Sequence, residues 1–207
     1  KKKKNREKKG SIYEGGLRVP GIIEWPARKL KGRTSVPVAT FDIYPTLLAM
    51  AGVELYAPHP LDGMDVSGII SGSVTERNKP MGFWHQLQGG QGTRSDQIQK
   101  AIMEKQQAGA PLPHDPVRMR KDVDEFPQFP EETTTGHAAW NDWPWKLHRI
   151  KGTRYELYNL NDDPMEKIDL SKNPEQAQRV KQMKQELDDW MRSVIRSING
   201  KDYQALK

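Results

Sequence analysis

The sequence predicts an α/β fold that ends in a small antiparallel sheet covered by a long C-terminal helix. Two stretches are expected to form adjacent strands, Trp140–Ile150 as a hairpin and Arg154–Leu160 as the strand that follows it. The hairpin turn falls at Asn141-Asp142-Trp143-Pro144, whose residue types favour turns. Residues 174–198 then place apolar side chains three to four positions apart, the pattern of a helix with one buried face. Because a helix stripe and a sheet face both need apolar partners, we expect them to pack together.

The last helix has well-marked ends. Asn173 belongs to the residue types preferred at helix N-caps, and Pro174 suits the first helical position, where its missing N–H would have no partner anyway. Asn199-Gly200 ends the pattern. We expect the strands to be covered by the apolar stripe of this helix, which consists of Val180, Met183, Leu187, Trp190, Met191, Val194, Ile195 and Ile198.

Four shorter elements are predicted upstream. Leu17–Trp25 has the β-branched residues of a strand, and Pro20 places it at a sheet edge or a bend. A helix is expected from Asp42 to Gly52, with Asp42 as a cap in preference to a metal ligand. A short helix near Val66–Ser71 and a strand over Met81–His85 follow. The spacing of the first helix predicts a core-facing side made of Phe41, Tyr44, Leu47, Leu48 and Ala51.

Residues 91–136 differ from their surroundings. Asp96–Gln107 has helical composition, but Gly109–Pro130 contains five prolines and many charges. A proline-rich stretch of this length is typical of a surface loop or lid. We therefore divide the chain into a basic tail (1–8), the end of an α/β core (9–90), an insertion or lid (91–136) and a C-terminal subdomain of strands and helix (137–207).

The composition narrows the function classes. The 207 residues have a net charge of +6, but residues 1–9 hold seven Lys/Arg and one Glu, so the remaining residues are neutral overall. This tail is not accompanied by a nucleic-acid-binding motif, and nucleic acid is not expected as a partner. The absence of cysteine excludes disulfides and a cysteine nucleophile. No membrane span is expected, and no signal peptide is recognised at the N-terminus.

A glycine-rich basic stretch, residues 8–20, is the most informative motif, and we call it the lysine loop. It combines Lys8, Lys9, Glu14 and Arg18 with three glycines. Glycine allows a close backbone approach and lysine offers a compact cation, so such a turn can contact an anion. Taken alone, the residues favour an exposed basic turn that leads into a strand over an anion-contacting loop.

The lysine loop and several later motifs together resemble the C-terminal half of the type I sulfatases, of the arylsulfatase and N-acetylgalactosamine-sulfatase kind. The resemblance covers roughly residues 9–90 and 137–195, and implies an alkaline-phosphatase-like fold of which this chain is the C-terminal part. The matching segments, in order, are Lys9-Gly10-Ser11-Ile12-Tyr13-Glu14-Gly15-Gly16-Leu17-Arg18-Val19-Pro20, Trp25-Pro26, Pro37-Val38, Asp42-Ile43-Tyr44-Pro45-Thr46-Leu47-Leu48, Ala51-Gly52, Leu61-Asp62-Gly63, Trp145-Lys146-Leu147, Glu156-Leu157-Tyr158-Asn159-Leu160 and Asp163-Pro164.

The resemblance implies hydrolysis of sulfate esters. The family uses a formylglycine nucleophile, a calcium ion held by Asp and Asn side chains, and lysine and histidine side chains that offset charge on the sulfate. Lys9 matches the lysine that contacts the sulfate; Lys8 is adjacent, but the spacing to Glu14 favours Lys9. Glu14 and Arg18 are expected to hold the loop in shape through hydrogen bonds and an ion pair. His85 is a candidate substrate contact, although an ordinary histidine at a strand end is the alternative.

The remaining machinery is not found in this sequence. The formylglycine motif and the aspartates of the calcium site, which precede the lysine loop in the family, are not recognised here. We therefore expect the C-terminal fragment of a sulfuric ester hydrolase, inactive alone, acting with its missing N-terminal region on a sulfated carbohydrate or aryl sulfate. A periplasmic or secreted location is implied by the resemblance. The alternative is a non-catalytic sulfate- or glycan-binding module derived from the same fold.

Overall fold

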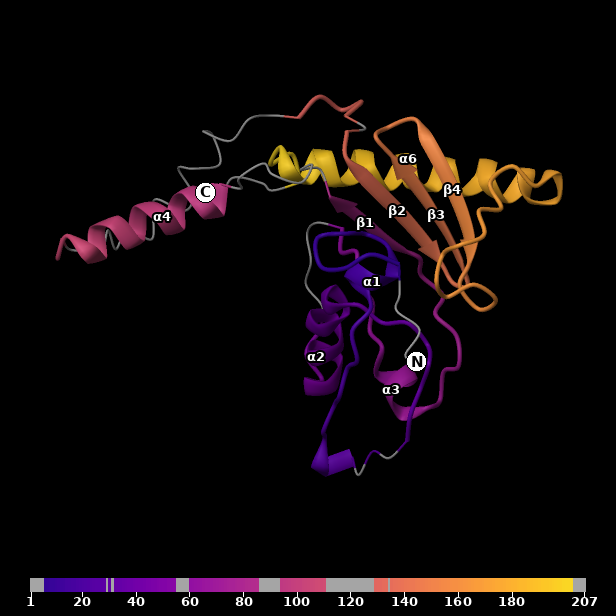
Figure 1. Cartoon of the computed structure of the whole chain (residues 1–207). Helices are drawn as coiled ribbons and strands as arrows, with labels where there is room; N and C mark the ends of the chain where they lie inside the picture. Colours follow the sequence, from indigo (N-terminus) through magenta and orange to yellow (C-terminus); the bar gives the residue numbers. More distant parts are fainter. Residues whose placement is uncertain are drawn as a thin grey trace, which may run out of the picture.

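A four-stranded antiparallel sheet forms the centre of the protein, seen in the computed structural model of Figure 1. The structure describes residues 6–28, 30, 32–54, 60–85, 94–110, 129–133 and 135–202, with the backbone alone for 94–99 and 101. The strands, in the order β1-β2-β3-β4, are β1 (Met81–His85), β2 (His137–Asp142), β3 (Trp145–Ile150) and β4 (Arg154–Asn159). The predicted strand, hairpin and following strand are therefore confirmed.

The C-terminal helix covers one face of this sheet, as predicted (Figure 1). A 3-10 turn, η3 (Pro174–Gln176), leads into α6 (Ala177–Ile198), and Asn173 caps it by accepting a hydrogen bond from the Glu175 backbone N–H at 3.1 Å. Five of the eight residues of the predicted stripe are buried, Val180, Met183, Leu187, Met191 and Ile195, and the first four pack on strand residues that include Leu147 and Leu157. Trp190 and Val194 are partly buried, and Ile198 is 44% exposed.

The opposite face of the sheet is polar. Side chains alternate between the two faces of a strand, so Lys146 and His148 of β3 point away from α6, as do Glu156 and Tyr158 of β4. All four are buried, at no more than 8% exposure. What covers them is the N-terminal segment that begins at Arg6, and this contact forms the candidate site described below.

The strand predicted over Leu17–Trp25 is wrong. The lysine loop instead contains one helical turn, α1 (Glu14–Leu17), and residues 18–25 have no strand partner among the described residues. Their apolar side chains are open to solvent, with Val19 75%, Ile22 96% and Ile23 57% exposed. A β-branched sequence forms a strand only where another strand supplies hydrogen-bond partners, and none does so here.

The helix predicted from Asp42 to Gly52 is confirmed, but its buried side is not the predicted one. The turn η2 (Thr40–Asp42) leads into α2 (Ile43–Ala51), which ends at Gly52 with φ of +66°. Tyr44 and Leu47 are 54% and 57% exposed, while Thr46 is buried. The Thr46 hydroxyl donates to the Asp42 carbonyl oxygen at 2.6 Å and accepts from the Val66 N–H at 3.0 Å. These polar contacts, and not the apolar stripe, orient α2.

The remaining elements are short or lie apart from the sheet. The turn η1 is Pro26–Arg28, and the predicted short helix is present as α3 (Ser67–Ser71) with Ile69 buried. The helix α4 (Arg94–Gln107) lies away from the sheet in Figure 1. Most of the proline-rich stretch lies outside the described residues. Within the described parts of the chain, no helix has the length and apolar character needed to cross a membrane.

Candidate functional site

The lysine loop is folded tightly back on the residues that precede it. The Gly15 N–H donates to the Arg6 carbonyl oxygen at 3.0 Å, and the Gly16 N–H donates to the Tyr13 carbonyl oxygen at 2.8 Å. A Cβ atom would lie 2.3 Å from the Arg6 carbonyl oxygen at Gly15 and 1.9 Å from the Ser11 carbonyl oxygen at Gly16. Both positions therefore need glycine, which explains the Gly15-Gly16 pair of the motif.

Lys9 lies in this loop with its side chain exposed. Among the residues that the structure describes, it makes no ion pair. The loop therefore presents a lysine cation to solvent from a backbone that is held by buried contacts. This position is compatible with the predicted contact between Lys9 and an anion, which stays a prediction.

A buried ionic group lies beneath the loop. The Lys146 ammonium is fully buried, 2.8 Å from Glu14 Oε1 and 3.0 Å from Glu166 Oε1, and it donates to the Ile12 carbonyl oxygen at 3.0 Å. Glu166 Oε2 accepts the Glu14 backbone N–H at 2.6 Å. One lysine between two carboxylates thus joins the loop to β3 and to the segment after β4. Because charge is costly to bury unpaired, this pairing strongly constrains the loop.

A chain of two histidines extends from the same carboxylate. His148 Nε2 lies 2.8 Å from Glu166 Oε1, and His148 Nδ1 lies 2.8 Å from His137 Nε2. Each ring can donate one proton along this chain while both stay neutral. Burial, followed by the nearby charge of Lys146, lowers the pKa of His148 well below its usual value. Burial also lowers the pKa of His137, to about 4.

A third carboxylate, that of Glu156, holds the aromatic ring of the loop. Glu156 Oε2 accepts hydrogen bonds from the hydroxyls of Tyr13 at 2.6 Å and Tyr158 at 2.8 Å. Burial alone would raise the pKa of Glu156, but these hydrogen bonds and the charge of Arg6 outweigh it and lower the pKa. The Tyr13 ring stacks on His148 at 4.5 Å between centroids, and the Arg6 guanidinium lies 3.8 Å from its centroid on the ring face.

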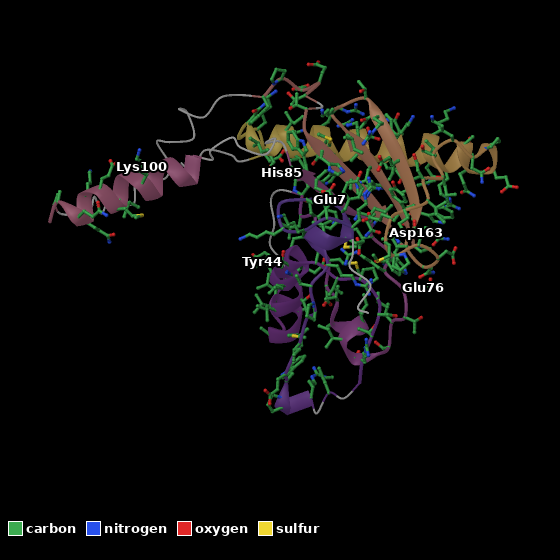
Figure 2. The ribbon with its side chains drawn as sticks, in the orientation of Figure 1. Glu7, Tyr44, Glu76, His85, Lys100 and Asp163 are labelled. Atoms are coloured by element: carbon green, nitrogen blue, oxygen red, sulfur yellow. The ribbon has the colours of Figure 1, made fainter. Side chains whose placement is uncertain are left out.

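The other predicted site residues divide between the buried group and the surface. Glu14 makes its ion pair with Lys146; the Arg18 side chain is exposed, and the Arg18 backbone N–H donates to the Glu14 carbonyl oxygen at 2.9 Å. His85 ends β1, is exposed and lies opposite His137 in the strand register. Figure 2 labels His85 and Glu7, the latter from the segment that leads into the lysine loop. The structure thus brings Glu14 into the buried group and leaves Lys9, Arg18 and His85 at the surface.

The described residues do not fit a calcium site. No group of three or more histidine or carboxylate side chains within the described ranges could hold a metal ion. The buried carboxylates already have partners: Glu14 and Glu166 pair with Lys146, and Asp42 pairs with Arg77 at 2.8 Å. The calcium ion implied by the resemblance therefore stays a prediction about other parts of the protein.

The buried group itself was not predicted from the sequence. The sequence does contain one sign of this group: Lys146 and His148 lie two positions apart on one strand, and Tyr158 and Glu156 lie opposite them on the next. Polar side chains at every second position usually indicate a solvent-facing side. No periodic pattern marks Glu166, because it lies in an irregular segment between β4 and η3. Only the covering of this face by the N-terminal segment makes the group buried.

Comparisons with known proteins identify relatives for part of the chain. No family model matches. The steryl-sulfatase of Rattus norvegicus is 36% identical over 67 residues, covering 32% of this chain and 12% of that protein. Arylsulfatase A of Homo sapiens is 37% identical over 79 residues, covering 37% and 15% of the two chains. A sulfatase of Formosa agariphila is 36% identical over 85 residues, covering 39% and 15%.

Solved structures show only a weak likeness. A 2-O GAG sulfatase has a TM-score of 0.41 at 18% identity, covering 80% of this chain and 26% of its own. A phosphonate monoester hydrolase of Agrobacterium radiobacter has a TM-score of 0.39, covering 74% and 24%. The segment shared with this chain makes up only 12–15% of the length of the curated relatives named above. About a third of this chain, by sequence, matches the sulfatase family.

Proposed function

We propose that this chain forms part of a sulfuric ester hydrolase with an alkaline-phosphatase-like fold. The observation that supports the proposal best is the exposed Lys9 on a loop anchored by the buried pair of Lys146 and Glu14. The sequence similarity to sulfatases over about a third of the chain agrees with it. The substrate would be a sulfated carbohydrate or an aryl sulfate.

Lys9 would act by electrostatics. A sulfate ester is anionic, and charge on its oxygens shifts as the ester bond breaks. A fixed ammonium beside those oxygens stabilises the transition state most when its backbone is already in place, because no reorganisation is then needed. His85, at the end of β1, is proposed as a second substrate contact. Glu14, and Arg18 through its backbone, support the loop.

The nucleophile and the metal would come from elsewhere in the protein. We infer that the formylglycine and the calcium ligands lie outside these 207 residues, and that this chain alone does not hydrolyse sulfate esters.

An extensive apolar surface agrees with this inference. Nine of the large exposed apolar side chains lie between positions 19 and 74: Val19, Ile22, Ile23, Val38, Ile43, Tyr44, Leu47, Val53 and Val74. We propose that the remainder of the protein covers this face, which we call the apolar face.

The complete protein would act in the periplasm or be secreted. This part of the proposal rests on the resemblance to sulfatases. Fractionation of cells that express the full-length protein, with sulfatase activity measured in each fraction, tests it: activity confined to the cytosolic fraction would contradict the proposed location.

The proposed role of Lys9 is tested by comparing two neighbouring lysines. In the full-length protein, Lys9→Ala should lower kcat/KM for 4-nitrophenyl sulfate by about 100-fold or more, the usual effect of removing one group that stabilises transition-state charge. Lys8→Ala, which removes the adjacent exposed lysine, should change kcat/KM by no more than about twofold. Equal effects of the two substitutions, or no hydrolysis of sulfate esters by the full-length protein, would refute the assignment.

A further inference from the structure

We infer that Glu166 is a positioning residue, which fixes the lysine loop through the Glu14 backbone and through Lys146. Its connection to catalysis rests on the function proposed above, but its effect on the loop does not. Glu166 is fully buried, and its carboxylate interacts with three groups from two parts of the chain: the Glu14 N–H of the lysine loop, and the Lys146 ammonium and the His148 ring of β3.

The backbone of Glu166 supports this role. Its φ is +52°, in the left-handed region that residues other than glycine rarely adopt. Such a conformation persists only where the surroundings determine it strongly, and it is concentrated at functional sites. Glu166 also accepts, at its own carbonyl oxygen, a hydrogen bond of 2.8 Å from Arg6, just before the lysine loop. The residue therefore contacts the loop region on both sides, before Lys9 through Arg6 and after it through Glu14.

The chemistry of the contact requires a carboxylate. Each Glu166 oxygen faces donors, with Oε2 facing the Glu14 N–H, and Oε1 facing Lys146 and the proton on His148 Nε2. A glutamine side chain has almost the same shape but offers one oxygen and one NH₂ group. In either orientation its NH₂ would meet a donor, so Glu166→Gln must lose the loop contact or the Lys146 contact.

The chain offers a matched control in Glu156. It is also buried on the same sheet face, at 8% exposure, and also holds the loop region, through the Tyr13 hydroxyl. Both of its buried hydrogen bonds reach the same oxygen, Oε2, whereas Oε1 faces only the exposed Arg154. A glutamine at this position keeps both bonds. Glu156→Gln therefore removes the same charge and weakens the ion pair of 3.5 Å between Glu156 and Arg6, but it keeps both tyrosine hydrogen bonds.

Limited tryptic digestion of the 207-residue chain measures the loop directly. Lys9 and Arg18 are exposed cleavage sites on either side of the Glu14 contact, while Lys181 and Lys184 in α6 report global unfolding. In Glu166→Gln, cleavage after Lys9 and Arg18 should accelerate at least tenfold, with cleavage in α6 unchanged. In Glu156→Gln, all sites should stay within about twofold of the wild type.

A loop that stays protected in Glu166→Gln, or equal acceleration at the loop and in α6, would overturn the inference. If circular dichroism shows that Glu166→Gln does not fold, Glu166→Asp serves instead, because it keeps the charge but withdraws the carboxylate by one methylene. Its expected result is the same acceleration confined to the loop.

A double-mutant cycle in the full-length protein tests whether Glu166 acts through Lys9. Glu166→Gln should lower kcat/KM for 4-nitrophenyl sulfate, and Lys9→Ala with Glu166→Gln should lower it no further than Lys9→Ala alone. Additive losses would contradict a positioning role. The two proposals fail separately, because absent sulfate hydrolysis refutes the function while the digestion result still decides the role of Glu166.

Discussion

At the residue scale, single side chains in this protein often join segments that are far apart in the sequence. Asp42 was predicted to cap the helix that follows it, but its side chain makes no capping hydrogen bond to α2. It is instead the third residue of η2 and accepts the Ala39 N–H at 2.7 Å. It also accepts the Met64 N–H at 2.9 Å and pairs with both terminal nitrogens of Arg77. A local contact near this helix start could be predicted from the sequence. The Arg77 pair could not, because it depends on how residues 64–77 fold back over η2.

His137 leads to a prediction about acid stability. Burial lowers its pKa to about 4, and the charge of Lys146 acts in the same direction, while Glu7, Glu156 and Glu166 act against it. In the unfolded chain, His137 takes up a proton below a pH of about 6.5. In the folded protein, His137 takes up this proton only below a pH of about 4. Stability should therefore fall as pH decreases through this interval. Thermal melts at pH 7 and pH 5 should show a smaller loss of Tm in His137→Gln than in the wild type.

The matching control for this measurement is His85→Gln, because His85 is exposed and lies opposite His137 on the neighbouring strand. It should leave the acid loss of Tm as large as in the wild type. A wild-type Tm that is constant between pH 7 and pH 5 would show that His137 does not resist protonation.

At the element scale, the periodic apolar patterns of the helix and the hairpin predicted the fold well. The composition of an isolated segment did not predict a strand. The stripe on α6 and the alternation on β3 and β4 identified elements that form within one continuous stretch, where local pattern and final contacts agree. The strand expected at Leu17–Trp25 had the right residue types but pairs with no strand in the part of the chain that the structure describes. The partner of β1, by contrast, is β2, more than fifty residues further along the chain, and no sequence pattern indicates this pairing.

The contact between α6 and the sheet should dominate the stability of the C-terminal part. Leu187 is fully buried against Ala138, in the cluster that also contains Met191. Truncating such a leucine removes buried apolar area and leaves a cavity, so Leu187→Ala should lower the free energy of unfolding by about 2–5 kcal/mol. Lys181→Ala, on the exposed side of α6, should change it by less than about 0.5 kcal/mol. Urea denaturation of both variants measures the difference, and similar midpoints would contradict this packing.

At the scale of the whole molecule, apolar exposure is unevenly distributed. The apolar face defined above includes Ile22 at 96% and Leu47 at 57% exposure, whereas the large apolar side chains of α6 and the strands, apart from Ile198, are buried or partly buried. Large apolar side chains left exposed in this number promote association in water. The isolated 207-residue chain should therefore self-associate, and its apparent mass in sedimentation velocity should rise with protein concentration.

Charged substitutions on the apolar face measure how much this face contributes to self-association. Ile22→Glu combined with Leu47→Glu should shift sedimentation towards the monomer without changing the circular dichroism spectrum. Ile168→Glu is the matched control, since Ile168 is equally open, at 64% exposure, but lies outside the apolar face. A wild-type chain that stays monomeric and melts cooperatively would contradict the prediction.

The Glu14–Glu166 contact also has a consequence for protein synthesis. Lys146 and Glu166, the partners of the lysine loop, are translated after it, because they lie 132 and 152 residues further along the chain than Glu14. At ribosomal rates of about 5–20 residues per second, the loop must wait on the order of ten seconds or more before its anchor exists. During that interval the loop lacks the contacts with Lys146 and Glu166 that hold Glu14 in the folded protein. The loop is therefore translated among the first residues of this segment and takes its final form among the last.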